Sequence, residues 1–405
     1  MRISWRTTAP ILVLSLWLAM ICGVAAVAET IHSEAPAGPR RTLELQEQWR
    51  VGGEDADLMF GLMIEALTDD RGNVYLLDQQ LCNVTVVGPD GQVTGTLGRQ
   101  GEGPGEIRTP QGICFMPDGV LAVAEQFPGK LIRLLPNGDP GGTVTLGRGT
   151  EGGFTAVSSC RGRAGNLLLG ALFQAPIEHG QSRQSYLATV SIEGQEQVRF
   201  REHTTNLDFE KAHFIEREML APFLGAHALG PDGRVYALRD RNEYLIDVFA
   251  PDGTLERSIS RVFEPVARTQ KEKDRINELF EVQDRNLPFD ITWEIEQHEQ
   301  VIDGIFVDLE GRLWVEHARS SMDQPAGVLT TYDVFGVDGR WLEEVSVACG
   351  GDPAYDGILP LEDGRLLLVK GLVLARLTAS GSQGAVFDEE GGDAAQEVIC
   401  YQVGQ

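Results

Sequence analysis

Residues 97–126, LGRQGEGPGEIRTPQGICFMPDGVLAVAEQ, decide the fold. The stretch begins as a glycine-rich loop in which Pro104 excludes helix. A short apolar run at 113–116 leads into Pro117-Asp118-Gly119, a turn in which proline presets φ and glycine accepts a positive φ. Residues 120–124 are apolar at every position, as in a strand covered on both faces. The stretch therefore predicts a loop, a strand, a tight turn and a second strand.

The same pattern recurs along the chain and can be aligned on the glycine of the tight turn. Most units continue with a third strand, a second turn and a fourth strand, as at 83–97, and in the last unit the third strand is expected at 374–377. Units of four antiparallel strands, repeated six times, predict an all-β fold, the six-bladed β-propeller. The aligned glycines are Gly72, Gly119, Gly165, Gly233, Gly311 and Gly364.

Two insertions lengthen the repeat, at 202–223 and at 263–300, the second between blades 4 and 5. The second contains a short helix signal, because Thr269 and Glu272 fit a capping box, apolar residues follow at helical spacing and Pro288 ends the pattern. We expect this helix to pack on a propeller face as a lid or rim. A solvated spacer without function is the alternative.

The two ends of the chain each offer a strand. Residues 42–51 alternate in polarity before the repeats begin, and 397–403 end the last repeat. Because a propeller hides its strand edges by closing, we expect these strands to share a blade in a propeller that spans 42–405. Residues 29–41 are polar and contain proline, which predicts a loose leader.

Residues 1–28 have the features of a signal peptide. Arg2 and Arg6 precede a mostly apolar run, and Ala26-Val27-Ala28 fits a small-x-small cleavage site. An uncleaved membrane anchor is the alternative, since the apolar run barely reaches spanning length. We therefore expect an extracytoplasmic protein, either periplasmic or secreted.

Charge and cysteine usage restrict the partners. A net charge of −26 repels nucleic acid and anionic membranes, so we expect no nucleic-acid partner and no membrane contact beyond a possible anchor. The six cysteines become five if the signal peptide is removed, an odd number that does not suit a disulfide framework. Export would still permit Cys349 and Cys400 to pair. No serine-elbow, HExxH or Rossmann motif is present.

The glycine-rich stretch at 98–126 resembles the NHL-type propeller repeat. It shares that repeat's glycine-rich connector, Pro-x-Gly strand start and Asp-Gly turn. The whole chain resembles the exported six-bladed propeller proteins of bacteria. This resemblance implies the fold and says little about function, because fold does not fix function.

Two other stretches, 64–78 and 301–315, resemble blades of gluconolactonase-type propellers. That resemblance implies that Glu65 and Asp303 are ligands of a divalent cation such as Ca²⁺ at the channel mouth. The family's middle-blade asparagine is missing here, because the matching residues are Leu224-Gly225-Ala226-His227. Asp356 holds the position of Asp303 in the next blade, so the two could bind a cation together or act as an acid–base pair. Turn formation by Asp-Gly is the alternative explanation.

Residues at equivalent repeat positions are expected to form rings around the central channel. Six positions after the aligned glycines, acids occupy early blades and cations later ones. This predicts a channel polarised across its diameter, suited to a ligand with both charges or to an anion near Arg239 and Lys370. Mutual neutralisation of the charges is the alternative. The ring is Asp78, Glu125, Ala171, Arg239, His317 and Lys370, and a second ring, eight positions before the glycines, is Ile64, Gln111, Val157, Gly225, Asp303 and Asp356.

The absence of a complete catalytic set favours a non-catalytic exported propeller. It would bind an unidentified small molecule or protein on the face that carries the insertions. The alternative is a metal-dependent lactonase- or esterase-like hydrolase that uses Glu65 and Asp303. His213 with Glu216, in the first insertion, is a further candidate pair of metal ligands.

Overall fold

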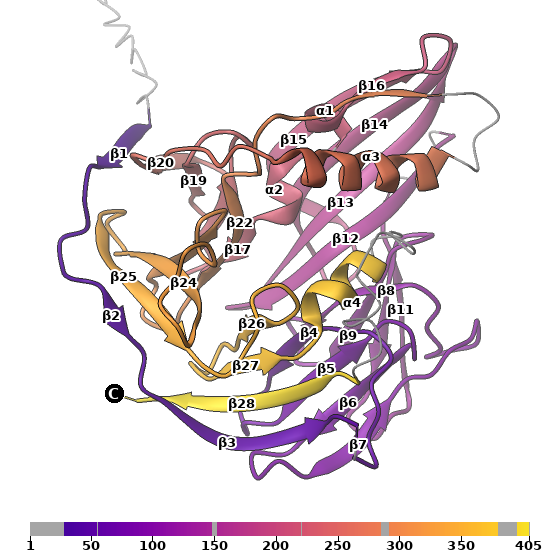
Figure 1. The fold of residues 1–405 in the computed structure, drawn as a ribbon. Helices are drawn as coiled ribbons and strands as arrows, with labels where there is room; N and C mark the ends of the chain where they lie inside the picture. Colours follow the sequence, from indigo (N-terminus) through magenta and orange to yellow (C-terminus); the bar gives the residue numbers. More distant parts are fainter. Residues whose placement is uncertain are drawn as a thin grey trace, which may run out of the picture.

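The computed structural model describes residues 28–54, 56–147, 152–219, 221–284, 291–379 and 395–404. Its strands form a ring of six blades around a central channel, and each blade has four antiparallel strands at its core (Figure 1). The predicted six-bladed β-propeller is therefore confirmed. The expected signal peptide lies outside the described residues, apart from Ala28. Within the described ranges, no helix is long and apolar enough to span a bilayer.

The first three blades follow one another without interruption. Blade 1 contains β4 (Met63–Thr68), β5 (Val74–Asp78), β6 (Asn83–Val87) and β7 (Val93–Leu97). Blade 2 contains β8 (Pro110–Phe115), β9 (Leu121–Glu125), β10 (Lys130–Leu134) and β11 (Pro140–Thr145). Blade 3 has longer strands, namely β12 (Phe154–Arg163), β13 (Asn166–Ile177), β14 (Gly180–Val190) and β15 (Glu196–Asp208).

The remaining blades include segments from both chain ends. Blade 4 contains β17 (His227–Leu229), β18 (Val235–Leu238), β19 (Leu245–Phe249) and β20 (Leu255–Arg261). Blade 5 contains β22 (Ile302–Val307), β23 (Leu313–His317), β24 (Val328–Phe335) and β25 (Trp341–Ala348). Blade 6 contains β26 (Gly357–Pro360), β27 (Leu366–Val369), β28 (Glu397–Val403) and β3 (Leu45–Gly52).

The ring closes in blade 6, where the N-terminal strand β3 pairs antiparallel with the C-terminal strand β28. Val398 lies opposite Val51 and Cys400 opposite Trp49. These residues are part of one core cluster that also contains strands of blade 1. Closure therefore rests on hydrogen bonds and apolar packing between the two ends of the chain.

The expectation of a loose leader at 29–41 is wrong for two parts of this segment, because they form strands. Strand β1 (Glu29–Ser33) pairs in parallel with β20, and β2 (Arg41–Thr42) pairs in parallel with β25. The outer edges of blades 4 and 5 offer unpaired backbone groups, and the leader satisfies them. Arg41 also donates two hydrogen bonds to Glu343.

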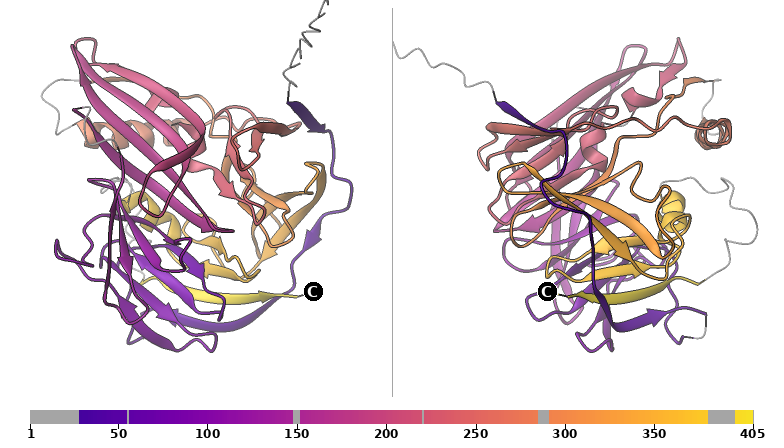
Figure 2. Two further views of the ribbon diagram at one scale, coloured as in Figure 1. Left: turned by 180° about the vertical axis from the view of Figure 1, so that it is seen from behind. Right: turned by 60° about the vertical axis from the view of Figure 1, so that its left-hand side comes forward.

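The long connections open on one face of the ring. In a blade of four antiparallel strands, the links from strand two to strand three and from strand four to the next blade lie on the same side. We call this side the insertion face. It carries the β13–β14 hairpin, β16 (His213–Ile215), α1 (Glu216–Met219), α2 (Pro222–Gly225), α3 (Gln270–Asp284), β21 (Thr292–Glu294) and α4 (Leu372–Ala379). Figure 2 shows α3 and α4 on the same side of the ring.

Both insertions differ in detail from their prediction. Residues 202–208 are not inserted, because β15 continues through them in pairing with β14. The helix of the second insertion forms as α3, and its capping box is present: the Thr269 amide donates to Glu272 Oε2 at 2.5 Å and the Glu272 amide to Thr269 Oγ1 at 3.3 Å. Phe280 stacks on Trp293 with ring centroids 3.9 Å apart. Pro288 lies outside the described residues.

The last unit departs from the repeat in a way that matters for the channel. The strand expected at 374–377 is wrong, because these residues belong to helix α4 and the third strand of blade 6 is β28. Ala375 of α4 packs into the core of blade 1. The cysteines of the described residues are all free, Cys349 and Cys400 included.

Gly162 marks the closest approach of two blades. A Cβ added there would overlap the carbonyl oxygen of Phe115 in the neighbouring inner strand. Gly162→Ala should therefore force blades 2 and 3 apart and cost stability at the upper end of the roughly 1–3 kcal/mol typical of overpacking. Urea denaturation measures this loss. Gly95→Ala, where an added Cβ meets nothing within 4 Å, is the matched control and should change stability by less than about 1 kcal/mol.

Candidate functional site

The central channel contains a cavity of about 600 Å³. The inner strand of every blade lines it, because these strands run side by side along the propeller axis. Polar and charged side chains from all six blades line this cavity, together with Arg376 of α4.

Four inner strands carry a β-bulge at the same place, near the end of the channel that opens to the insertion face. The pairing shifts by one residue between Met63 and Glu65, and at the equivalent points of blades 2, 3 and 5. Bulges re-aim side chains and are common beside functional sites. The extra residues all line the cavity, and they are Ile64, Gln111, Ser158 and Asp303.

The second predicted ring coincides with most of this bulge ring. Ile64, Gln111 and Asp303 are bulge residues, and Gly225 also lines the cavity. In blade 3 the expected position is displaced by one residue, because Val157 is fully buried and Ser158 takes the bulge.

Glu65 and Arg161 form an ion pair across the cavity wall. Arg161 Nη1 donates to Glu65 Oε1, and the amide of Ile113 donates to Glu65 Oε2 at 2.9 Å. Gly112 makes room for this carboxylate, since a Cβ at that position would lie 2.9 Å from Oε2. One carboxylate thus links blades 1, 2 and 3, and part of the Arg161 guanidinium stays open to the cavity, where the side chain is 42% exposed.

Arg376 enters the channel from the insertion face. Burial lowers the pKa of its guanidinium, the charges of Glu316, Glu65 and Tyr332 raise it, and the charge of Arg161 lowers it further. Arginine keeps its charge nonetheless. Within the described part of the chain, its guanidinium makes no hydrogen bond and no ion pair. The side chain is exposed and lines the cavity, so its charge is open to a ligand.

Asp303 and Glu316 place two carboxylates on blade 5. Burial, followed by the charges of Glu316 and Glu299, raises the pKa of Asp303 to about 7, and Arg241 opposes this rise. Burial likewise raises the pKa of Glu316, whose Oε1 accepts a hydrogen bond from Thr330 at 2.9 Å. Asp303 is exposed to the cavity, and the protein around the cavity still desolvates its carboxyl group. Blade 5 thus presents carboxyl groups that lack sufficient positive charge nearby.

Two further polar residues of the cavity, Arg163 and His227, have partners within the fold. Arg163 donates to the carbonyl oxygens of Leu229, Val307 and Asp308, which fastens blade 3 to blades 4 and 5. Burial lowers the pKa of His227 to about 4, so the ring is neutral at pH 7. Its Nδ1 lies 2.8 Å from the Phe223 carbonyl and must donate, and its Nε2 accepts from Ser159 at 3.0 Å.

The first predicted ring does not line this cavity. The position six residues after the turn glycine is the end of the second strand, so its side chain turns to neighbouring loops and strands. Asp78 accepts from the amides of Gly61, Leu62 and Leu81, and Glu125 accepts from the Arg108 amide and pairs with Lys130 at 3.1 Å. These two acids stabilise loops.

The cations of that ring are also engaged. Arg239 donates to Asp247, and His317 Nε2 lies 3.4 Å from Asp333. Lys370 donates to Asp356 at 2.8 Å and to the Gly350 carbonyl at 2.7 Å. The charged residues of this ring therefore have local partners within their own parts of the fold.

The residues considered for a metal site do not fit a calcium centre. Glu65 is held by Arg161, and Asp356 accepts from Lys370 and from the amides of Gly371 and Asp352. Calcium takes six to eight oxygen ligands, whereas the described residues contain no group of three His, Cys, Asp or Glu side chains that could hold a metal. His213 and Glu216 do not form a pair of metal ligands either. His213 Nδ1 lies 3.0 Å from Thr292 Oγ1, whereas the Glu216 carboxylate accepts a hydrogen bond from Arg241.

Calcium is therefore expected to leave the protein unchanged. A native-state site with a Kd of about 10 µM would stabilise the fold by about 2.7 kcal/mol at 1 mM ligand. We expect the melting temperature of residues 29–405 to stay constant in a calcium titration to 1 mM. A concentration-dependent rise that disappears in Asp303→Ala would contradict this account of the carboxylates.

Comparisons with known proteins show no family for this chain. No protein-family model and no curated protein matches the chain, so the NHL-type identity is not confirmed. A putative exported protein from Bacteroides fragilis has 13% identity over 93% of this chain and 99% of its own, with a TM-score of 0.47. Regucalcin from Agrobacterium tumefaciens, a calcium-binding protein, has 13% identity over 90% and 96%, with a TM-score of 0.41. Virginiamycin B lyase from Staphylococcus aureus has 11% identity over 80% and 81%, with a TM-score of 0.40. Likeness at this level concerns the fold alone.

Proposed function

We propose that the protein is an extracytoplasmic, non-catalytic binding protein that holds a small charged ligand in its central channel. The observation that carries the proposal is Arg376, a charged side chain that helix α4 places at the cavity. Within the described residues, its guanidinium has neither a hydrogen-bond acceptor nor an ion-pair partner. A guanidinium that lines a cavity without an acceptor fits a site that a ligand completes.

The form of the cavity supports the same proposal. Its volume of about 600 Å³ lies within the range of small-molecule sites. The bulges in four inner strands re-aim side chains at one level of the channel, close to Arg376 on the insertion face. A rigid ring of strands surrounds that level, which limits the reorganisation that binding would require.

A metal-dependent hydrolase receives less support. Its implied ligand Glu65 is neutralised by Arg161, and Asp356 is neutralised by Lys370. Asp303 alone remains open to the cavity. We therefore place the ligand, rather than a metal ion, at the level of Asp303 and Arg376.

A channel-filling variant tests the proposed function. Gly304 lines the cavity, and a Cβ added there meets nothing closer than Glu316 Oε2 at 4.0 Å. Gly304→Leu should fill the channel while the protein stays folded, and Gly95→Leu on an outer strand is the matched control. A library of polar metabolites, screened by thermal melting, should yield ligands that stabilise the wild type and Gly95→Leu but not Gly304→Leu. Ligands that stabilise all three proteins equally, or no ligand at all, would refute a channel site.

A further inference from the structure

Among the described residues, three charged groups of the cavity have no hydrogen-bond or ion-pair partner, namely Arg376, Asp303 and Glu362. Arg161 already pairs with Glu65, and its charge also acts on Glu362. The open guanidinium is therefore that of Arg376, below α4.

Blade 5 carries two carboxyl groups of the cavity. Gly304 pairs with Glu316 across β22 and β23, and the bulge places Asp303 beside this pair. Arg376 is the cation nearest to Glu316, whereas the cation near Asp303 is Arg241, which already donates to Glu216 outside the cavity. Two carboxyl groups thus compete for little positive charge.

Resting on the proposed function, we infer that the ligand is a small zwitterion. Its acid group binds Arg376 and Arg161, and its ammonium group binds between Asp303 and Glu316. Arginine suits the acid group because its planar donors match a carboxylate bidentately. The ammonium supplies the positive charge that blade 5 lacks.

Ligands with a single charge fit less well. A simple anion would satisfy the arginines but would face the blade 5 carboxylates without compensation. A simple amine would leave Arg376 without a partner, and a metal ion lacks further protein ligands beside Asp303. Discrimination of this kind arises because the wrong ligand leaves a desolvated charge unpaired.

Binding should also depend on pH with a defined sign. The charged groups around Asp303 are Glu316 of β23, Glu299 of the preceding loop and Arg241 of blade 4, and they leave its pKa at about 7. The ammonium binds the ionised form, so ligand binding competes with the proton on Asp303. The affinity of the wild type for the ligand should rise about tenfold from pH 6 to pH 8. The affinity of Asp303→Asn should not change with pH over this range.

Calorimetry with ω-amino acids tests the inference. We would titrate glycine, β-alanine, 4-aminobutanoate and 6-aminohexanoate into residues 29–405 at pH 8, with butanoate and butylamine as singly charged probes. One length of amino acid should bind at least tenfold more tightly than either single-charge probe. Asp303→Asn and Arg376→Gln should each lower the affinity for that amino acid at least tenfold. Glu310→Gln, which removes an exposed carboxylate from an outer turn of the same blade, should leave affinity unchanged.

The outcomes separate this inference from the proposed function. Butylamine or butanoate binding as tightly as the amino acid would overturn the zwitterion, and so would equal affinity in Arg376→Gln. If no amino acid binds but the metabolite screen gives a ligand blocked by Gly304→Leu, the channel site stands and the zwitterion is wrong. If neither experiment gives a ligand, both are wrong.

Discussion

Asp333→Ala should lower the free energy of unfolding by about 3–5 kcal/mol, the range for removal of one partner of a buried ion pair. Asp333 is completely buried in β24. Its Oδ2 accepts from Tyr244 Oη at 2.7 Å and from Arg261 Nε at 2.6 Å, and His317 Nε2 lies 3.4 Å away. The alanine variant leaves the Arg261 charge desolvated and without its carboxylate.

Because this network joins two blades, its loss should lower the free energy of unfolding of the whole propeller. Arg261 and Tyr244 belong to blade 4, whereas Asp333 belongs to blade 5. The same device recurs one junction earlier, where Arg201 of β15 reaches Asp247 of β19 at 3.3 Å. Buried arginine–aspartate pairs thus fasten blades that apolar packing alone would leave free to slide.

The effect of Asp333→Ala should depend on pH. Burial alone would raise the pKa of Asp333, but the hydrogen bond and charge of His317, the charge of Arg261 and the bond from Tyr244 outweigh burial and hold the pKa below 3.8. A carboxyl group with a lowered pKa stabilises the fold above its unfolded pKa, and this contribution is lost as the pH falls through the folded value. The stabilities of the wild type and Asp333→Ala should therefore converge below about pH 4.

Urea denaturation at pH 7 and pH 3 measures both effects. Asp338→Ala, at an exposed turn of the same blade, is the control and should cost less than about 1 kcal/mol. A loss below 1 kcal/mol for Asp333→Ala at pH 7 would show that the network does not fasten the blades.

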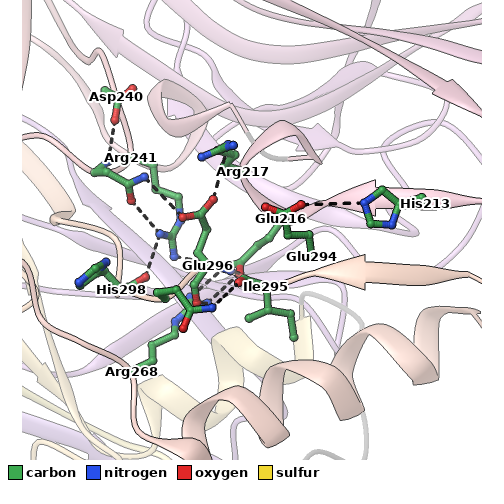
Figure 3. Close-up of polar contacts among 12 residues, drawn as sticks. His213, Glu216, Arg217, Asp240, Arg241, Arg268, Glu294, Ile295, Glu296 and His298 are labelled. Carbon is green, nitrogen blue, oxygen red and sulfur yellow. Dashed lines mark hydrogen bonds and ion pairs between the residues drawn. The ribbon is translucent and has the colours of Figure 1, made fainter.

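Glu216→Ala should release the second insertion from the propeller. Figure 3 shows Glu216 at the centre of a cluster that joins α1, blade 4 and the segments on either side of α3. Its carboxylate accepts from Arg268 at 2.7 and 2.9 Å, from Arg241 at 3.2 Å and from the Glu296 amide at 2.9 Å. Both arginines are buried, so removal of the carboxylate leaves Arg241 without its ion-pair partner and Arg268 with Glu299 alone.

The release should appear in α3 rather than in the blades. Arg268 immediately precedes Thr269, which caps α3, so loss of its anchor frees the start of the helix. We expect faster hydrogen exchange and faster proteolysis across 270–284, with local stability reduced by about 3–5 kcal/mol. Glu218→Ala, an exposed glutamate of the same helix α1, should leave exchange unchanged. Equal exchange in Glu216→Ala and the wild type would contradict an anchoring role.

The sequence predicts the blades because each repeat carries its own turn chemistry. Gly72 and its equivalents adopt positive φ, which ties the register of every unit to a residue visible in the sequence. The helix α3 is predictable for a similar reason, since its capping box is a local signal. The leader strands are not predictable in this way, because β1 and β2 pair with outer edges that exist only once the blades have formed.

The cavity is harder to predict, and Arg376 shows why. The sequence of residues 374–377 predicts a third strand, so the position of Arg376 in a helix above the channel was missed. The helical spacing of Leu372, Ala375 and Arg376 is the signal that could have found it. The first ring does not line the channel for a different reason. The position six residues after the turn glycine lies at the end of the second strand, whereas the bulges of the inner strands determine which side chains line the channel.

The central claim is that the channel binds a small ligand beside Arg376, and native mass spectrometry tests it most directly. The wild-type protein and Gly304→Leu would be purified in parallel and transferred into the gas phase without denaturation. The account predicts a small molecule bound to the wild type at a ratio of one to one, lost from Gly304→Leu and weakened in Arg376→Gln. A molecule retained equally by all three proteins, or a wild type that carries none and acquires none from the metabolite library, would contradict it.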